Sequence, residues 1–117
     1  MQTTNLLEIK INEGKNILQN ISHMRRTSGP AINVVYYISE DIEQCRKAIE
    51  KWQLTSKDFL IGAFGESHRY VLAFADTISK KNSGFNYQRE FISEVNRGMS
   101  VLESVQESLQ MGICLEK

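Results

Sequence analysis

Hydrophobic residues recur along the first part of the chain at steps of three and four, with polar residues between them. The line they form consists of Leu7, Ile11, Gly14, Leu18 and Ile21. Such spacing predicts an amphipathic helix, and the side-chain oxygens of residues 3–5 can cap its start. Because a glycine lies on the apolar line, we expect a second helix to approach this one closely.

A break follows at residues 27–30, which read Thr-Ser-Gly-Pro. Beyond it the apolar residues again step by three and four, along Val35, Ile38, Ile42, Cys45, Ile49 and Trp52. The valine, isoleucine and tyrosine residues near the start favour a strand. The longer periodicity nevertheless predicts a helix over residues 32–53. Cys45 and Trp52 lie on its apolar line, so both are expected in the core.

Two shorter helices are predicted next, separated by a glycine turn. Thr55 or Ser56 is expected to cap the first of them, which ends where Gly65 adopts a left-handed conformation. Ser67 is then expected to cap the second. The apolar residues of that second helix are Tyr70, Val71, Phe74, Ala75 and Ile78.

The last helix is predicted over residues 86–110. Its apolar line consists of Ile92, Val95, Met99, Leu102 and Leu109, and Phe91 and Val105 widen it. Each apolar stripe needs a partner, so the sequence predicts an all-α bundle of four to five helices. We expect residues 1–117 to form a single domain, either standing alone or as the N-terminal domain of a longer protein.

Composition narrows the classes of partner. The 14 basic and 14 acidic residues of the 117-residue chain give no basic excess, which makes nucleic acid an unlikely partner. No apolar run is long enough to cross a membrane, and the N-terminus lacks the pattern of a signal peptide. Cys45 and Cys114 form no CxxC pair. These features predict a cytoplasmic protein.

The segment "FLIGAFGESHRYVLAF", residues 59–74, has the glycines of a catalytic or phosphate-binding loop but matches no such motif. Ser67 and His68 are neighbours, and on a helix their side chains would point about 100° apart, which disfavours a nucleophile–base pair. Neither His23 nor His68 has a partner at metal-ligand spacing. We therefore expect no catalytic residue, no metal and no cofactor, and a protein that is not an enzyme.

Two groups of residues are candidates for binding. Arg25 and Arg26 are expected to end the first helix, where they suit its dipole, and they are also a candidate anion contact. Met111, Ile113 and Leu115 leave the end of the chain apolar and predict an interface with a second copy or with a following effector domain.

Other functions stay open at this point. Trp52, at the end of its stripe, is an alternative interface residue. A ligand-sensing or nucleic-acid-contacting domain that uses Arg25, Arg26, Lys80 and Lys81 is the main alternative function. A small enzyme ranks third.

The order of these features resembles a known family, namely the small helical domain that precedes catalytic domains in some bacterial defence-type proteins. Among these are nucleotide-binding proteins with a Toll/interleukin-receptor-like domain. The resemblance covers most of the chain and rests on Gly14, Ile17, Leu18, Trp52, Phe64, Gly65, Ser67, Phe74, Gly98, Leu102 and Gly112. It implies a non-catalytic interaction or oligomerisation module, with the activity in a separate domain that is not part of this sequence.

Overall fold

The computed structural model describes residues 3–28, 35–79 and 87–111 of the chain. Their helices are α1 (Thr3–Ser22), α2 (Ser39–Phe64), α3 (Arg69–Ser79) and α4 (Tyr87–Gln110). Two short antiparallel strands, β1 (Arg26–Ser28) and β2 (Val35–Tyr37), pair Arg26 with Tyr37 and Ser28 with Val35. The predicted all-α bundle is confirmed, with a small strand pair added to it.

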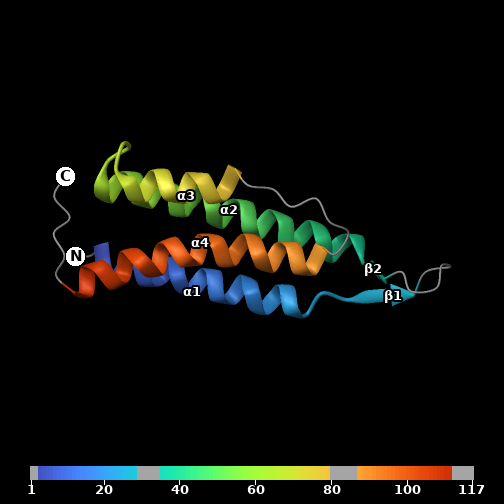
Figure 1. The fold of residues 1–117 in the computed structure, drawn as a ribbon. Coiled ribbons are helices and arrows are strands. Elements are labelled where there is room, and N and C mark those ends of the chain that lie inside the picture. Colours follow the sequence, from blue (N-terminus) through green and yellow to red (C-terminus); the bar gives the residue numbers. More distant parts are fainter. Residues whose placement is uncertain (1–2, 29–34, 80–86, 112–117) are drawn as a thin grey trace.

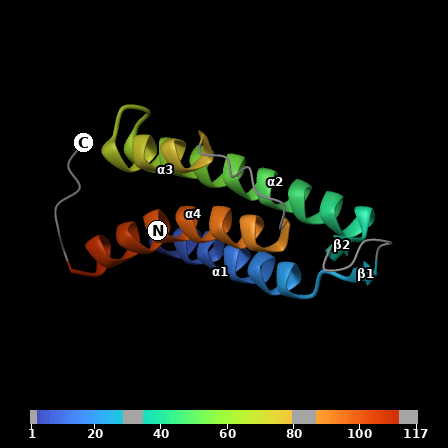
Figure 2. The ribbon, with the colours of Figure 1, turned by 45° about the vertical axis from the view of Figure 1, so that its right-hand side comes forward.

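The helices run alternately in opposite directions around a common core (Figure 1). In both views α1 lies beside α4 and α2 beside α3 (Figures 1 and 2). α1 also packs along α2, and α3 along α4, so the helices close into a ring. The start of α1, the turn between α2 and α3, and the end of α4 share one end of the bundle, which we call the turn end. β1 and β2 lie at the opposite, hairpin end.

The core is apolar and is drawn from every helix. Its fully buried large side chains are Leu7, Ile21, Ile49, Leu60, Phe74, Val95, Leu102 and Val105. Trp52 lies among them with 3% of its surface exposed, and its ring edge meets Phe74 at 6.1 Å between centroids. The indole N–H donates a 2.8 Å hydrogen bond to the carbonyl of Lys10, which joins α2 to α1. Both Trp52 and Cys45 are thus core residues, as their apolar line predicted.

The second helix begins later than predicted. Residues 35–37 form β2, and Ile38 has an extended backbone (φ −70°, ψ 129°), so the predicted helical start at residue 32 is wrong. The strand preference of valine and tyrosine prevails here because β1 supplies a pairing partner. The carboxylates of Glu40 and Asp41 then occupy the first turn of α2, where the helix dipole favours them.

No break occurs at Thr55 or Ser56, because α2 is continuous from Ser39 to Phe64. The Thr55 hydroxyl donates to the carbonyl of Trp52 one turn earlier and accepts from Lys10, so it bonds within and beside the helix instead of capping one. Ser56 is fully buried on the same stripe as Trp52 and Leu60. Burial of this stripe keeps the helix intact, and the predicted boundary is wrong.

The turn after α2 agrees with the prediction at Gly65 and differs from it at Ser67. Gly65 has φ 99°, and its N–H donates to the carbonyl of Ile61, so the predicted stop at a glycine with positive φ is confirmed. Its ψ of 148° lies outside the left-handed helical region that was expected. Ser67 does not cap α3. His68 does so instead, since its Nδ1 accepts the N–H of Tyr70 at 3.1 Å and its carbonyl accepts the N–H of Leu72.

Candidate functional site

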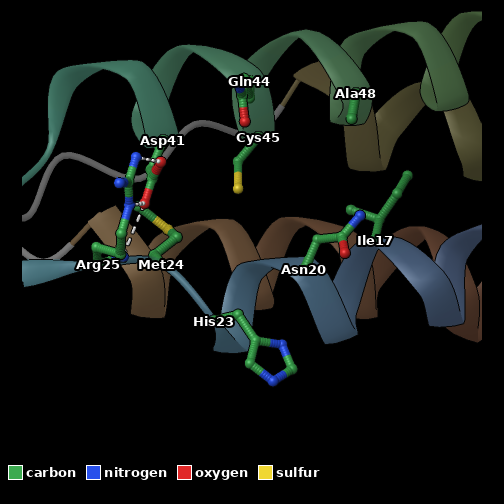
Figure 3. A pocket seen from close by; sticks show the side chains of 9 residues that line it. All are labelled: Ile17, Asn20, His23, Met24, Arg25, Asp41, Gln44, Cys45 and Ala48. Atoms are coloured by element: carbon green, nitrogen blue, oxygen red, sulfur yellow. Dashed lines mark hydrogen bonds and ion pairs between the residues drawn. The ribbon is translucent and has the colours of Figure 1, made fainter.

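A pocket of about 360 Å³ opens between the end of α1 and the start of α2, at the hairpin end (Figure 3). Its walls are Ile17, Asn20, His23, Met24, Arg25, Asp41, Gln44, Cys45 and Ala48. Apolar side chains and the Cys45 thiol face the gap between the helices, and an ion pair closes one side (Figure 3). This is the size of a small-molecule site.

The ion pair joins Arg25 to Asp41 through three hydrogen bonds. The Arg25 backbone N–H and Nε donate to Oδ2 of Asp41 at 2.8 and 3.0 Å, and Nη2 donates to Oδ1 at 2.8 Å. These bonds to the charged form lower the pKa of Asp41 to about 2, and the same contact raises the pKa of Arg25. The pair therefore fastens the chain beyond α1 to the first turn of α2.

The predicted anion contact at Arg25 and Arg26 is not assembled. α1 ends at Ser22, so the expectation that these two arginines end the first helix is wrong. Asp41 neutralises the guanidinium of Arg25, and Glu40 lies 3.7 Å from it, so an anion would have to displace a carboxylate. Arg26 is exposed at the start of β1.

The cysteine and the histidine of this pocket do not form a catalytic pair. Burial, with a smaller effect from the charge of Asp41, raises the pKa of the Cys45 thiol and keeps it neutral. The His23 ring turns away from the gap (Figure 3), and its Nδ1–H donates to the carbonyl of Gln19 at 2.8 Å. Within residues 3–28, 35–79 and 87–111, no three His, Cys, Asp or Glu side chains are placed to hold a metal ion.

A second cavity, of about 370 Å³, is a groove between α3 and α4 near the turn end. Its walls are Arg69, Tyr70, Ala73, Ser100, Val101 and Ser104. The guanidinium of Arg69 lies over the ring of Tyr70, 5.3 Å from the centroid. The hydroxyl of Tyr70 is buried and has no hydrogen-bond partner within the described residues. The groove thus combines small side chains and a stacked cation, and one of the residues that line it, Tyr70, has a buried unsatisfied hydroxyl.

An aromatic cluster holds the wall of this groove in place. The Tyr70 ring lies 4.7 Å from the His68 ring and meets the Phe64 ring edge-on at 5.2 Å. Phe64 and His68 are themselves 5.1 Å apart. His68 is thus half-buried in this cluster and also caps α3.

The predicted interface residues have different positions. Trp52 is buried, which favours its core role over contact with a partner. Met111, directly after α4, is 70% exposed. Ile113 and Leu115, as well as Lys80 and Lys81, lie outside the described residues.

Three features of these sites were not predicted from the sequence. The capping role of His68 was hidden because histidine is not a preferred N-cap residue. Asp41 was recognisable as a carboxylate in a first helical turn. Its pairing with Arg25 was not, because the two strands separate these residues in the sequence. Ser100 and Ser104, four residues apart on one helix face, did give a signal for a shallow groove wall.

The chain matches no protein-family model, no curated protein and no solved structure. No helix in the described part of the chain has the length and apolar character needed to cross a bilayer.

Proposed function

We propose that this domain is a non-catalytic helical interaction module that associates with protein, either a second copy of itself or an effector domain. The observation that carries the proposal is the position of its exposed apolar side chains. Among the described residues, four such side chains belong to the turn end, and we call them the apolar rim. They are Leu6 (49% exposed), Ile9 (50%), Leu72 (59%) and Met111 (70%).

The rim draws on three helices. Leu6 and Ile9 lie in the first two turns of α1, Leu72 in the first turn of α3, and Met111 directly after α4. The directions of the helices bring these segments to the same end of the bundle (Figure 1). Single exposed hydrophobic residues are common on monomers, and a contact surface needs several of them on neighbouring elements. α1 packs along α4, so Leu6, Ile9 and Met111 belong to neighbouring elements, whereas α3, which carries Leu72, lies diagonally across from α1. The resemblance to helical domains that accompany an effector in bacterial defence-type proteins supports the same function.

Sedimentation velocity on the full chain over a range of concentrations tests this proposal. We expect concentration-dependent association that Ile9→Glu combined with Met111→Glu weakens at least about tenfold, because a charge would have to be buried in the contact. Asn12→Glu and Gln110→Glu add the same charge at exposed neighbouring positions outside the rim and serve as controls. A chain that stays monomeric up to about 1 mM would contradict self-association through the rim.

A further inference from the structure

We infer that the groove between α3 and α4 binds one amphipathic helix of a partner protein, whose contacting face carries apolar residues and a carboxylate. The inference rests on the proposed interaction function and gives it a surface and a partner chemistry. The shape of the groove, the charge at its edge and one buried hydroxyl support it independently.

The shape follows from small side chains. Ala73 on α3 and Ser100 and Ser104 on α4 are exposed, and they leave a groove of about 370 Å³ with Val101 in its wall. Ser100 and Ser104 are one helical turn apart, so they form a continuous low ridge on α4. A helix laid along such a groove inserts the side chains at its own positions i, i+3 or i+4, and i+7. Bulkier residues at these three positions would prevent that approach.

Arg69 places one positive charge at the edge of the groove. The Arg69 guanidinium stacks on the Tyr70 ring, and no carboxylate of the described residues forms an ion pair with it. A stacked guanidinium keeps its planar fork available for bidentate pairing with a carboxylate. A second copy docking by this same face would bring like charges together. The acidic helix of a different protein is the better fit.

The hydroxyl belongs to Tyr70, whose side chain lines the groove. Tyr70 is 8% exposed, and its hydroxyl has no hydrogen-bond partner among the described residues. Buried hydroxyl groups in proteins are almost always hydrogen-bonded. The hydroxyl is inaccessible in the free chain, so a docked helix would have to shift the Tyr70 side chain before a backbone carbonyl or a side-chain oxygen of the helix could accept its hydrogen.

The test uses a synthetic, helix-stabilised peptide with Leu and Ala along one face and Glu residues beside them. A matched peptide carries Lys in place of every Glu. Titrated into the ¹⁵N-labelled full chain, the Glu peptide is expected to shift the amide signals of Ala73, Ser100, Val101 and Ser104. It should bind at least about tenfold more tightly than the Lys peptide. Arg69→Glu should reverse this preference.

Three further variants separate binding from folding. Ser104→Phe fills the groove at an exposed position and should abolish binding, whereas Asn16→Phe, exposed on α1 and outside the groove, should leave it unchanged. Tyr70→Phe removes the unsatisfied hydroxyl. It should therefore raise the melting temperature of the free chain and yet weaken peptide binding.

Any of three results would overturn the inference. The first is the absence of shifts at the groove with both peptides up to about 1 mM, and the second is equal affinity for the two peptides. The third is self-association that Ser104→Phe abolishes, which would assign the groove to a second copy. Neither peptide result bears on the apolar rim, which the sedimentation of the Ile9→Glu, Met111→Glu variant tests separately.

Discussion

The indole of Trp52 occupies the space that a side chain on Gly14 would need. A Cβ atom at Gly14 would lie 2.9 Å from Cζ2 of the indole and would also collide with Sδ of Met99. α1 can therefore approach α2 and α4 only because this position has no side chain. Gly98 on α4 also faces this ring, and a Cβ there would lie 3.0 Å from Cη2, the atom next to Cζ2.

This relationship predicts opposite effects at two helical glycines. Gly14→Ala should lower the free energy of unfolding by roughly 1–3 kcal/mol, because the added methyl group overpacks the core at Trp52 and Met99. Gly62→Ala, in α2, meets no atom within 4 Å and should raise it by about 0.5–1 kcal/mol through helix propensity. Urea denaturation measures both, and a stabilising Gly14→Ala would contradict the close approach.

The turn between α2 and α3 depends on backbone conformation at Gly65. A Cβ there would have open space, so any cost of substitution comes from the positive φ of 99° alone. Gly65→Val should lower the free energy of unfolding by at least about 1 kcal/mol. Equal stability of the variant and the wild type in thermal denaturation would show that the turn tolerates another conformation.

The cap of α3 is predicted to depend on His68 and not on Ser67. His68→Ala removes the acceptor for the Tyr70 N–H and should cost about 0.5–2 kcal/mol, whereas Ser67→Ala should change little. His68→Asp supplies a carboxylate at the same helix terminus and should recover part of the loss. Circular dichroism melting curves of the three variants test this order, and a larger effect at Ser67 would reverse the assignment.

The Arg25–Asp41 pair predicts how stability changes in acid. The pKa of Asp41 is about 2 in the folded chain, below its ordinary value of 3.8, so the unfolded chain takes up the proton first. The stabilisation is therefore fully present above about pH 4 and is lost as the pH falls toward 2. Asp41→Asn should be less stable than the wild type at pH 7, and the difference should shrink through this range. A constant difference in urea midpoint between pH 7 and 2 would argue against the pair.

The helices were predictable wherever one periodic stripe dominated. α1, α3 and α4 follow from their spacing within a few residues, and the stop at Gly65 follows from the rarity of positive φ in other residues. The errors arose where distant parts of the chain decide a local conformation. β2 forms because β1 pairs with it, and α2 continues past Thr55 because the stripe that contains Ser56 is buried in the bundle. The α3–α4 groove likewise depends on which helix faces are neighbours, which periodicity does not specify.

α3 has 11 residues, whereas α1, α2 and α4 have 20, 26 and 24. Among the described helices, the cross-section of the bundle therefore has four members at the turn end and three toward the hairpin end. Backbone amides exchange with solvent more slowly where more packed neighbours must separate first. Hydrogen exchange should be graded along the long axis, fastest beside the strands and slowest around Leu60 and Phe74. A partner that binds at the turn end would therefore contact the part of the molecule that unfolds last.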